Sequence, residues 1–313
     1  MSPTLGIIGA RGHTGAELLR LLENHPGLEV AAVSSRQLAG EAIKDHVDGV
    51  SLDLCFERLE PKEAAQRKLD AYVLALPNGV SAPFVDALEE VHPEAVIVDL
   101  SSDHRFDPTW QYGFPERFRE PIKSARRIAN PGCYATAMQV GLLPLVGMLA
   151  DEPHIFGVSG YSGAGTTPSP KNDINVLRDN LLPYSLCDHI HEREVRHQLE
   201  QGLYFMPHVA PFFRGITLTI STLFREETDA ATVLDHFRYF YDKEELIKVQ
   251  EETPLVRDTV GKHEVFLGGF TVSKEAHRMA FNVTLDNLLK GAATQAVQNL
   301  NLALGLRENE GIS

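Results

Sequence analysis

The chain has 313 residues, of which 43% are hydrophobic and 23% charged, and its net charge is −14. This composition is typical of a globular protein long enough for two domains, and the acidic balance argues against nucleic-acid binding, which needs a basic surface stripe. No apolar run is as long as a membrane span, no signal peptide precedes the first apolar segment, and the three cysteines lack disulfide or zinc-site spacing. We therefore expect no membrane or nucleic-acid partner and no metal.

The chain begins with an expected strand, a glycine turn and a helix. An apolar run over residues 5–8 precedes the turn, and leucines at helical spacing follow it over residues 16–22. Glycines allow a tight turn and a close approach of the backbone to a pyrophosphate, which the N-terminus of a helix attracts. The spacing is GxxGxxG rather than the commoner GxGxxG, so the flanking strand and helix carry the prediction of a dinucleotide site. The expected contacts are Gly9, Arg11, Gly12, His13, Thr14 and Gly15.

The next expected strand, residues 28–33, indicates the type of dinucleotide. It ends in Ser34, Ser35 and Arg36, where NAD-binding units carry an acidic residue for the ribose 2′-hydroxyl. Two hydroxyls and a guanidinium group instead suit a 2′-phosphate. We expect NADP(H) as the cofactor; the alternative is that Arg36 is an ordinary surface arginine.

Two further buried strands, residues 70–76 and 95–100, are separated by an expected helix over residues 80–91. Continuous Val, Ile and Leu strands that alternate with helices predict a Rossmann-like, doubly wound parallel sheet of the α/β class. Ligands of such sheets bind beyond the carboxyl ends of the strands. Because Pro77 and Asn78 follow such an end, we expect them to contact the cofactor.

The segment Asn130-Pro131-Gly132-Cys133 puts a thiol directly after a turn. Apolar residues at helical spacing predict a helix from residue 134 to about residue 149, so Cys133 lies at a helix N-terminus. Unpaired N–H groups and the helix dipole favour the thiolate there, which is the form that attacks acyl carbons. The alternative, a small buried cysteine, fits Cys55 and Cys187 better.

The sequence pattern changes after this helix. Segments 155–160, 217–223 and 279–285 alternate apolar and polar residues, as half-buried strands do. They predict an α+β domain with a mostly antiparallel sheet, accompanied by a helix over residues 230–241 and a last helix over residues 290–306. One face of this sheet is a candidate subunit interface.

Residues 188–194 form the densest group of titratable side chains. His189 and His191 share a face if the segment is extended and diverge if it is helical. Histidine titrates near neutral pH, so either one is a candidate acid/base for thioester formation and collapse. The expected substrate contacts are Arg105, Asn130, Glu194 and Arg214, and the alternative for the two arginines is a structural salt bridge.

Motifs along the whole chain occur in a specific order. They are GxxGxxG from Gly9, DLSSDHR from Asp99, NPGCY from Asn130, SGYSGAG from Ser159, HIH from His189 and DNLLKGA from Asp286. Together they resemble the motifs of the N-acetyl-γ-glutamyl-phosphate reductases of arginine biosynthesis, which are related to the aspartate-semialdehyde dehydrogenases. The resemblance implies an NADP-binding domain of residues 1–132, completed by 287–313, and a catalytic and oligomerisation domain of residues 133–286.

The resemblance also implies roles for individual residues. Cys133 is the implied nucleophile, His189 or His191 the acid/base, and Arg105 a phosphate contact. The implied reaction is the NADPH-dependent reductive dephosphorylation of N-acetyl-L-glutamyl 5-phosphate to the 5-semialdehyde, through a cysteine thioester and with release of inorganic phosphate. The implied contacts of the nicotinamide end are Ser162, Gly163 and Asn287.

Two positions depart from the common family pattern. Ala135 stands where many members carry proline and Thr166 where they carry a basic residue, and Lys171 is a candidate replacement for that charge. The segments 166–173 and 188–194 instead resemble the fungal type, in which this reductase is part of a mitochondrial bifunctional protein.

We expect a cytoplasmic homodimer or homotetramer that acts on a small acyl phosphate, with the mitochondrial matrix as the alternative location. The nearer alternative function is a related acyl-phosphate reductase of lysine or aspartate-family synthesis. The remoter one is a non-catalytic regulator that senses NADP(H) on the same fold.

Overall fold

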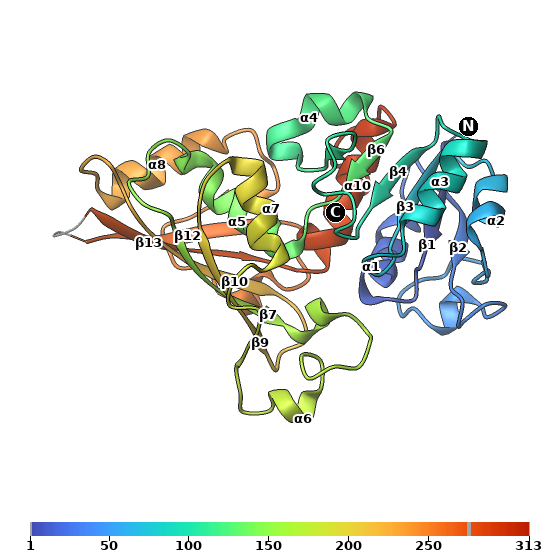
Figure 1. The fold of residues 1–313 in the computed structure, drawn as a ribbon, viewed down its shortest axis with the longest axis horizontal. Helices are drawn as coiled ribbons and strands as arrows, with labels where there is room; N and C mark the ends of the chain where they lie inside the picture. Colours follow the sequence, from blue (N-terminus) through green and yellow to red (C-terminus); the bar gives the residue numbers. More distant parts are fainter. Residues whose placement is uncertain (1, 274–276, 313) are drawn as a thin grey trace. The chain divides into compact units, whose positions relative to one another are not determined.

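The protein is described by a computed structural model that covers residues 2–273 and 277–312. The chain divides into two compact units (Figure 1): the first comprises the residues up to Gly132 together with those from Ala292 onward, and the second comprises Cys133–Gly291. The return to the first unit thus falls at Ala292, where the sequence analysis expects it at residue 287. Within the described residues, no helix combines the length and apolar character needed to cross a membrane.

The first unit is built on a parallel sheet with the strand order β2-β1-β3-β4-β6-β5. This confirms the predicted doubly wound α/β architecture. The strands are β1 Thr4–Ile8, β2 Glu29–Ser34, β3 Ala71–Leu74, β4 Val96–Asp99, β5 Gln111–Tyr112 and β6 Arg127–Ala129. The helices of this unit are α1 His13–Leu22, η1 Ile43–Asp45, α2 Pro61–Gln66, α3 Ala82–Val91, α4 Pro115–Ser124 and α10 Thr294–Ala303.

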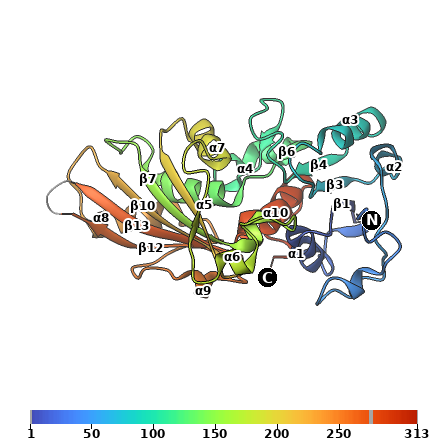
Figure 2. The same ribbon diagram turned by 60° about the horizontal axis from the view of Figure 1, so that its bottom comes forward.

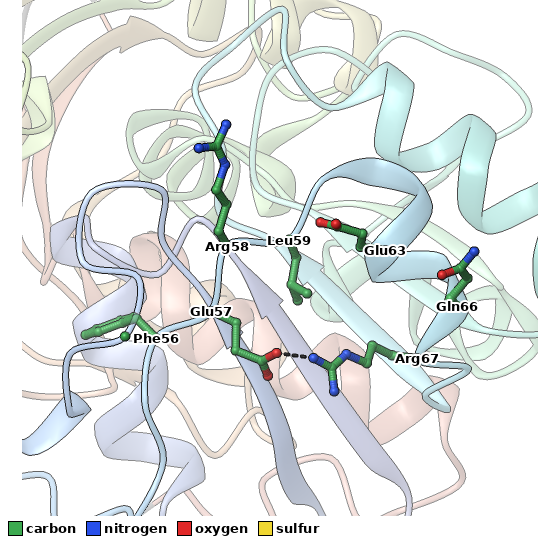
Figure 3. A pocket seen from close by; sticks show the side chains of 8 residues that line it. Phe56, Glu57, Arg58, Leu59, Glu63, Gln66 and Arg67 are labelled. Carbon is green, nitrogen blue, oxygen red and sulfur yellow. Dashed lines mark hydrogen bonds and ion pairs between the residues drawn. The ribbon is translucent and has the colours of Figure 1, made fainter.

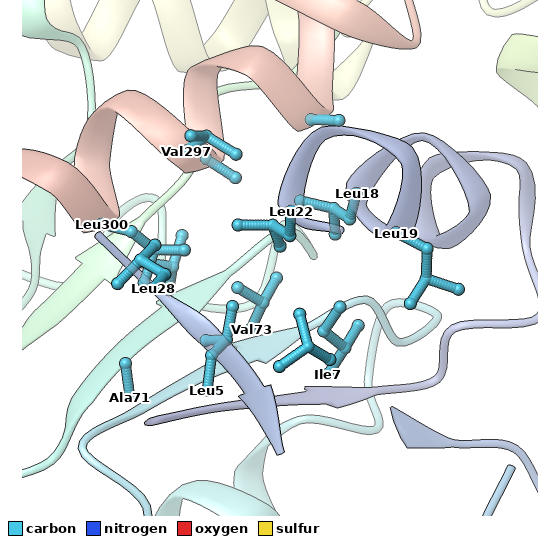
Figure 4. Close-up of a cluster of buried hydrophobic side chains, with 14 of the residues drawn as sticks. Leu5, Ile7, Leu18, Leu19, Leu22, Leu28, Ala71, Val73, Val297 and Leu300 are labelled. Atoms are coloured by element: carbon cyan, nitrogen blue, oxygen red, sulfur yellow. The ribbon is translucent and has the colours of Figure 1, made fainter. Parts of the chain in front are cut away.

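Hydrophobic side chains bury both faces of this sheet. On one face, Leu5 and Ile7 of β1 pack with Leu18 of α1 and Val297 of α10 (Figure 4). On the other face, Leu74 of β3 belongs to a second buried cluster with residues of α2 and α3. Because alternate residues of a strand point to opposite faces, a strand covered by helices on both sides must be apolar throughout. This explains why β3 and β4 are buried at every position.

The second unit is built on a mixed sheet with the order β11-β12-β13-β10-β7-β9-β8. The pairs β7–β9 and β11–β12 are parallel and the other neighbours are antiparallel, which confirms the predicted mostly antiparallel sheet. Its strands are β7 His154–Gly160, β8 Leu182–Pro183, β9 Tyr204–Ala210, β10 Ile216–Leu223, β11 Ile247–Val249, β12 Val265–Val272 and β13 Arg278–Leu285. Its helical segments are α5 Cys133–Leu142, η2 Leu143–Leu145, η3 Tyr161–Ala164, α6 Ile174–Leu177, α7 Ile190–Leu199, α8 Ala230–Phe240, α9 Val256–Thr259 and the π-helical η4 Leu289–Ala293.

Helices cover one face of this second sheet. Helix α5 contacts β10 and β13, and α8 contacts β12, on the side where β10 buries every second residue (Figures 1 and 2). The opposite face carries partly exposed aromatic side chains: Phe156 of β7 is 40% exposed and Tyr204 of β9 is 47% exposed. The His154 ring lies 4.9 Å from that of Tyr204, and the Phe156 ring 4.5 Å from that of His208, both pairs with tilted planes.

Two helix predictions were wrong in their extent. The helix expected over residues 134–149 ends at Leu142 and gives way to the short η2, because Pro144 has no N–H to continue the helical hydrogen bonds. The helix expected over residues 290–306 begins with the π-helical η4 and its α-helical part ends at Ala303, shortly before Gly305 with its φ of +75°.

Candidate active site

The glycine turn after β1 leaves an open helix N-terminus. Gly9 has a φ of +87°, and a Cβ atom on it would lie 2.6 Å from the carbonyl oxygen of Ala75. A Cβ on Gly15 would overlap the backbone of Ala10, whereas one on Gly12 would meet nothing within 4 Å. Gly12 is also the N-cap of α1 and offers no side-chain cap. The turn is therefore tightly packed at Gly9 and Gly15. At Gly12, where the N–H groups of the helix begin, there is open space that fits a bound pyrophosphate.

The carboxyl end of β2 holds the predicted 2′-phosphate residues. Ser34 and Ser35 are each 4% exposed, and the backbone carbonyl of Ser34 accepts hydrogen bonds from the N–H groups of Gly9 and Ala10. Arg36 lies on the surface, where its guanidinium contacts the Glu60 carboxylate at 2.9 Å. Glu60 also contacts Arg58 at 3.3 Å, and these interactions lower the pKa of the Glu60 carboxyl.

A polar pocket of about 480 Å³ lies beside these residues, between the strand-like segment that carries Glu57 and helix α2 (Figure 3). An ion pair between Glu57 and Arg67 crosses it. None of the predicted site residues lines this pocket. Its lining residues are Gly40, Phe56, Glu57, Arg58, Leu59, Glu63, Gln66 and Arg67.

The loops that follow β3 and β4 are tied together. Exposed Asn78, next to exposed Pro77, accepts a hydrogen bond from the Ser102 N–H at 3.0 Å, and the Gly79 N–H donates to the Asp103 carboxylate at 2.8 Å. The sequence placed these loops at the same sheet edge, and the hydrogen bonds join them there. Burial acts to raise the pKa of the Asp103 carboxyl. The hydrogen bonds from Gly79 and Ser81 outweigh this effect, so the pKa is lowered.

Arg105 and Asn130 lie at the same edge and contact each other. Arg105 is 7% exposed, and its Nε donates to the Asn130 backbone carbonyl at 2.9 Å. The Asn130 side chain is 1% exposed, and its carbonyl oxygen accepts from Asn299 of α10 at 3.0 Å. Its amide nitrogen donates to the backbone carbonyl of Ala292 at 3.4 Å. The Asn130 side chain therefore makes its hydrogen bonds to other residues of the first unit.

Cys133 is the first residue of α5 and is half-buried. Gly291 packs against it so closely that an added Cβ on Gly291 would lie 2.8 Å from the Cβ of Cys133. The helix start gives its sulfur the N–H groups and the positive dipole end that favour a thiolate. The interpretation of Cys55 and Cys187 as buried small residues was wrong: both are exposed, because both lie in loops whose side chains reach solvent.

The two predicted histidines meet at the start of α7. His189 is the N-cap of this helix, and its Nδ1 accepts a hydrogen bond from the backbone N–H of His191 at 3.1 Å. Although this segment turns into a helix, the two rings stay together, with centroids 4.9 Å apart. The ring of Tyr134, the residue after Cys133, lies 6.3 Å from the His189 ring and 6.2 Å from the His191 ring. The packing of α5 on α7 therefore brings Tyr134 together with both histidines, one residue after Cys133.

The electrostatics of this cluster fix the state of His189. Burial, and to a smaller extent the charge of Lys171, lower the pKa of His189 from 6.5 to about 4. His189 is therefore neutral at pH 7, and because its Nδ1 accepts a hydrogen bond, its Nε2 carries the proton. Burial and the negative charge of the Cys133 thiolate raise the pKa of Tyr184, whose ring lies 5.5 Å from that of His189.

Arg214 forms a structural salt bridge, which was the alternative to a substrate contact. Its Nε lies 2.6 Å from one carboxylate oxygen of Asp286 and its Nη2 donates to the other at 2.9 Å. Asp286, which is completely buried, also accepts from the backbone N–H groups of Gly261 and Leu288. Arg214 thus fixes the turn that precedes η4.

The residues predicted for the nicotinamide end come together in the second unit. The Asn287 side chain accepts from the Gly215 N–H at 2.7 Å and donates to the Ser162 hydroxyl at 2.9 Å. Gly163 is exposed beside them, and a Cβ on it would lie 3.0 Å from the Ser159 hydroxyl oxygen.

Glu194 is completely buried within α7, three residues after His191 and on the same side of the helix. This position does not expose its carboxylate to a ligand. Tyr134 belongs to the NPGCY motif, but the sequence analysis gave it no role. Tyr184 is a cluster member that no sequence pattern marks, since the packing of distant segments brings it in. Within the parts of the chain that are described, no group of three or more His, Cys, Asp or Glu side chains could hold a metal ion.

Comparisons with known proteins give the family. Residues 4–125 match the model of the semialdehyde dehydrogenase NAD-binding domain, and residues 133–287 match that of the semialdehyde dehydrogenase dimerisation domain. The first match confirms the predicted nicotinamide-dinucleotide cofactor.

Bacterial relatives of high identity carry the name of a reductase. The chain is 52% identical to an N-acetyl-gamma-glutamyl-phosphate reductase of Stenotrophomonas maltophilia over 97% of this chain and 96% of that protein. It is 52% identical to one of Xanthomonas campestris pv. campestris with the same coverage. It is also 51% identical to "Protein arg11, mitochondrial" of Schizosaccharomyces pombe, over 98% of this chain but 35% of that protein. With both bacterial and mitochondrial relatives, the cytoplasmic location stays a prediction.

Solved structures with the same fold are aspartate-semialdehyde dehydrogenases. One from Vibrio cholerae matches with a TM-score of 0.80 at 20% identity, covering 97% of this chain and 99% of that one. One with NADP from Candida albicans matches with a TM-score of 0.77 at 18% identity and the same coverage. The motif resemblance is thus confirmed: the chain belongs to the N-acetyl-γ-glutamyl-phosphate reductase family and is an NAD(P)-dependent oxidoreductase.

Proposed function

We propose that the protein reduces N-acetyl-L-glutamyl 5-phosphate to N-acetyl-L-glutamate 5-semialdehyde with NADPH, through a thioester on Cys133. One observation carries the proposal: half-buried Cys133 begins α5, and the next residue, Tyr134, packs its ring against two neighbouring histidines at the start of α7. The relatives named for this reaction, which belongs to arginine biosynthesis, support it.

Cys133 is the proposed nucleophile. Its sulfur forms a bond to the acyl carbon, the bond from that carbon to the phosphate oxygen breaks, and inorganic phosphate leaves. Two easier steps through a thioester replace one difficult reduction. Gly291 packs against the Cβ of Cys133, and a larger residue there would displace the proposed nucleophile.

The two histidines have different proposed roles, one in stabilising the oxygen anion and one in proton transfer. With a pKa of about 4, His189 is a poor proton carrier at neutral pH, but its Nε2–H is a fixed donor that stabilises the oxygen anion of the reduced thioester. His191 is the proposed acid/base that protonates this oxygen and takes the proton back when the thiohemiacetal collapses to aldehyde and thiolate. Glu194, buried on the same side of α7, is proposed to position His191 rather than to contact substrate.

The proposed cofactor contacts follow the geometry of each unit. The open turn around Gly12 takes the pyrophosphate, and Ser34, Ser35 and Arg36 take the 2′-phosphate, which competes with Glu60 for Arg36. In the second unit, Ser162, Gly163 and Asn287 are the proposed contacts of the nicotinamide end. When bound, NADPH supplies the hydride that reduces the thioester carbonyl.

Arg105 is the proposed phosphate contact. Two of its guanidinium nitrogens are held by the backbone carbonyls of Asn130 and Leu100, at 2.9 and 3.0 Å, so the side chain is oriented before a ligand arrives. Asn130 is therefore proposed as a positioning residue for Arg105. Arg214 is proposed to position Asn287 through its salt bridge with the neighbouring Asp286.

A homodimer is the proposed assembly. The face of the second sheet opposite α5 and α8 carries the exposed rings of Phe156 and Tyr204, and large exposed apolar patches mark protein interfaces. The match of this unit to a dimerisation domain supports the same choice.

An assay of the purified protein in the oxidative direction tests the proposed reaction. N-acetyl-glutamate 5-semialdehyde and NADP⁺ should give NADPH only when phosphate, or arsenate in its place, is present. Aspartate semialdehyde and the amino-adipate semialdehyde are the matched arms for the alternative reductases. Faster turnover of either one would reject the proposed substrate, and no turnover of any aldehyde would favour the non-catalytic alternative.

A further inference from the structure

Lys171 lies at the edge of the catalytic cluster of the second unit. Its Nζ is 4.9 Å from the centroid of the Tyr184 ring, in a cation–π contact. The Tyr184 ring in turn meets the His189 ring edge-on, with centroids 5.5 Å apart and an interplanar angle of 72°. A single aromatic ring therefore separates this ammonium group from the histidine that caps α7.

The charge of Lys171 also reaches the reacting groups. It contributes to the low pKa of His189, and the thiolate of Cys133 acts on the pKa of the same Tyr184 that Lys171 contacts. The electrostatic effect of a charge on the pKa of another group weakens over several ångströms. Lys171 and Cys133 thus both lie close to Tyr184, whose ring meets that of His189.

Within residues 2–273 and 277–312, no carboxylate forms an ion pair with Lys171. Two arginines of the second unit have acidic partners: Arg214 pairs with Asp286 at 2.6 Å, and Arg196 with Glu192 at 3.7 Å. Lys171 is half-buried, and its ammonium group contacts an aromatic ring instead of an acidic group. Such a site favours an anion from outside the chain.

The proposed substrate carries two anionic groups at opposite ends. Its acyl phosphate reacts at Cys133, and Arg105 is the proposed phosphate contact. Its α-carboxylate needs a second cation, at the far end of the molecule from the phosphate. The salt bridge with Asp286 commits Arg214, whereas Lys171 lies beside the cluster and forms no ion pair within the described residues, so it can accept this group.

We propose that Lys171 binds the α-carboxylate of the substrate, with the Tyr184 ring holding its ammonium group in place. This inference rests on the proposed function and adds the residue that distinguishes an amino-acid-derived acyl phosphate from a neutral one. A charged hydrogen bond of this kind changes kcat/KM by about 10- to 100-fold.

Two aldehydes that differ only in the carboxylate test the proposal. N-acetyl-glutamate 5-semialdehyde carries it, and 4-acetamidobutanal is the same molecule without it. The ratio of their kcat/KM values is measured with NADP⁺ and phosphate for the wild type, Lys171→Met and Lys171→Arg. We expect Lys171→Met to lose about 10- to 100-fold on the charged aldehyde and little on the neutral one, and Lys171→Arg to keep most of the ratio.

Lys262→Met is the matched control, because Lys262 makes a similar contact with a ring in the same unit, 5.2 Å from the centroid of Phe266. It should leave the ratio unchanged. An equal loss on both aldehydes in Lys171→Met would overturn the proposal, since it would mean that Lys171 acts on the reacting groups alone. An unchanged ratio would overturn it as well. Failure of the wild type on both aldehydes would instead reject the proposed function, and the carboxylate role with it.

Discussion

The glycine turn of the first unit and the proposed catalytic cluster of the second unit are built in opposite ways. The turn is continuous in sequence: residues 9–15 join β1 to α1 and pack against the ends of β2 and β3, and its proposed ligand groups are backbone N–H groups. The cluster is assembled from distant segments, with Cys133 from α5, Tyr184 from the loop after β8, and His189 and His191 from α7.

This difference decides how each region responds to mutation. A backbone site depends on space and on the conformation of a few residues, so a single methyl group can remove it. A side-chain cluster depends on the charge and proton state of each member, and burial sets these states. We therefore expect mutations in the turn to change binding or folding, and mutations in the cluster to change the chemistry at constant cofactor binding.

The largest expected effect is that of Cys133→Ser. Loss of the thiolate should lower kcat by roughly 10⁴-fold or more, because no other group can carry the acyl intermediate. The dissociation constant of NADPH, measured by fluorescence titration, should change little. Cys55→Ser, which alters an exposed cysteine of the other unit, is the control and should keep full activity. Turnover retained in Cys133→Ser would remove the thiol from the mechanism.

Replacement of the histidines should separate their two roles. His191→Gln should lower kcat by about 10²- to 10⁴-fold and remove the limb of the pH–rate profile near neutral pH. His189→Asn keeps a residue able to cap α7 and should lower kcat while leaving that limb in place, because His189 titrates at about pH 4. A shift of the neutral limb in His189→Asn, with none in His191→Gln, would reverse the assignment.

The low pKa of His189 also links the stability of the second unit to pH. Both folded and unfolded chains hold this ring neutral well above pH 6.5; between pH 6.5 and about 4 only the unfolded chain binds the proton. The free energy of unfolding should therefore fall as the pH drops through this window, by up to about 2 to 3 kcal/mol from this group. Urea unfolding at a series of pH values measures it, and the same series with His189→Asn should lack this share of the decrease.

The turn offers a matched pair of glycines. Gly15→Ala forces a methyl group into the backbone of Ala10 and should destabilise the first unit by about 1 to 3 kcal/mol. Gly12→Ala puts the same methyl group into open space at an ordinary φ of −71°, so the melting temperature should hold while NADPH binds about tenfold more weakly. Equal melting temperatures for both variants, or unchanged NADPH binding in Gly12→Ala, would contradict this description of the turn.

The fold could be predicted further than the site. Strand positions, the parallel sheet and the glycine turn follow from local patterns, since β3 and β4 are buried along their whole length and read as continuous apolar runs. The ends of helices were harder, because Pro144 and the π-helical η4 act against an otherwise helical pattern.

The members of the cluster could be predicted only where a motif marks them. Cys133 and the two histidines have motifs, but Tyr184 has none, and its place beside His189 depends on packing between segments. The partner of Arg214 also depends on the fold, since Asp286 lies far away in sequence. The exposure of Cys55 and Cys187 shows where a residue-type preference fails. Free cysteine is usually buried, but this is a statistical tendency that these two positions do not follow.

The central claim is that Cys133 carries the acyl group, and a single-turnover experiment without phosphate tests it most directly. With N-acetyl-glutamate 5-semialdehyde and NADP⁺ in excess, we predict a burst of about one NADPH per chain and an acyl group on the peptide that contains Cys133. Phosphate added afterwards should release the acyl group and restart turnover. No burst, or an acyl group on another residue, would contradict the proposed chemistry.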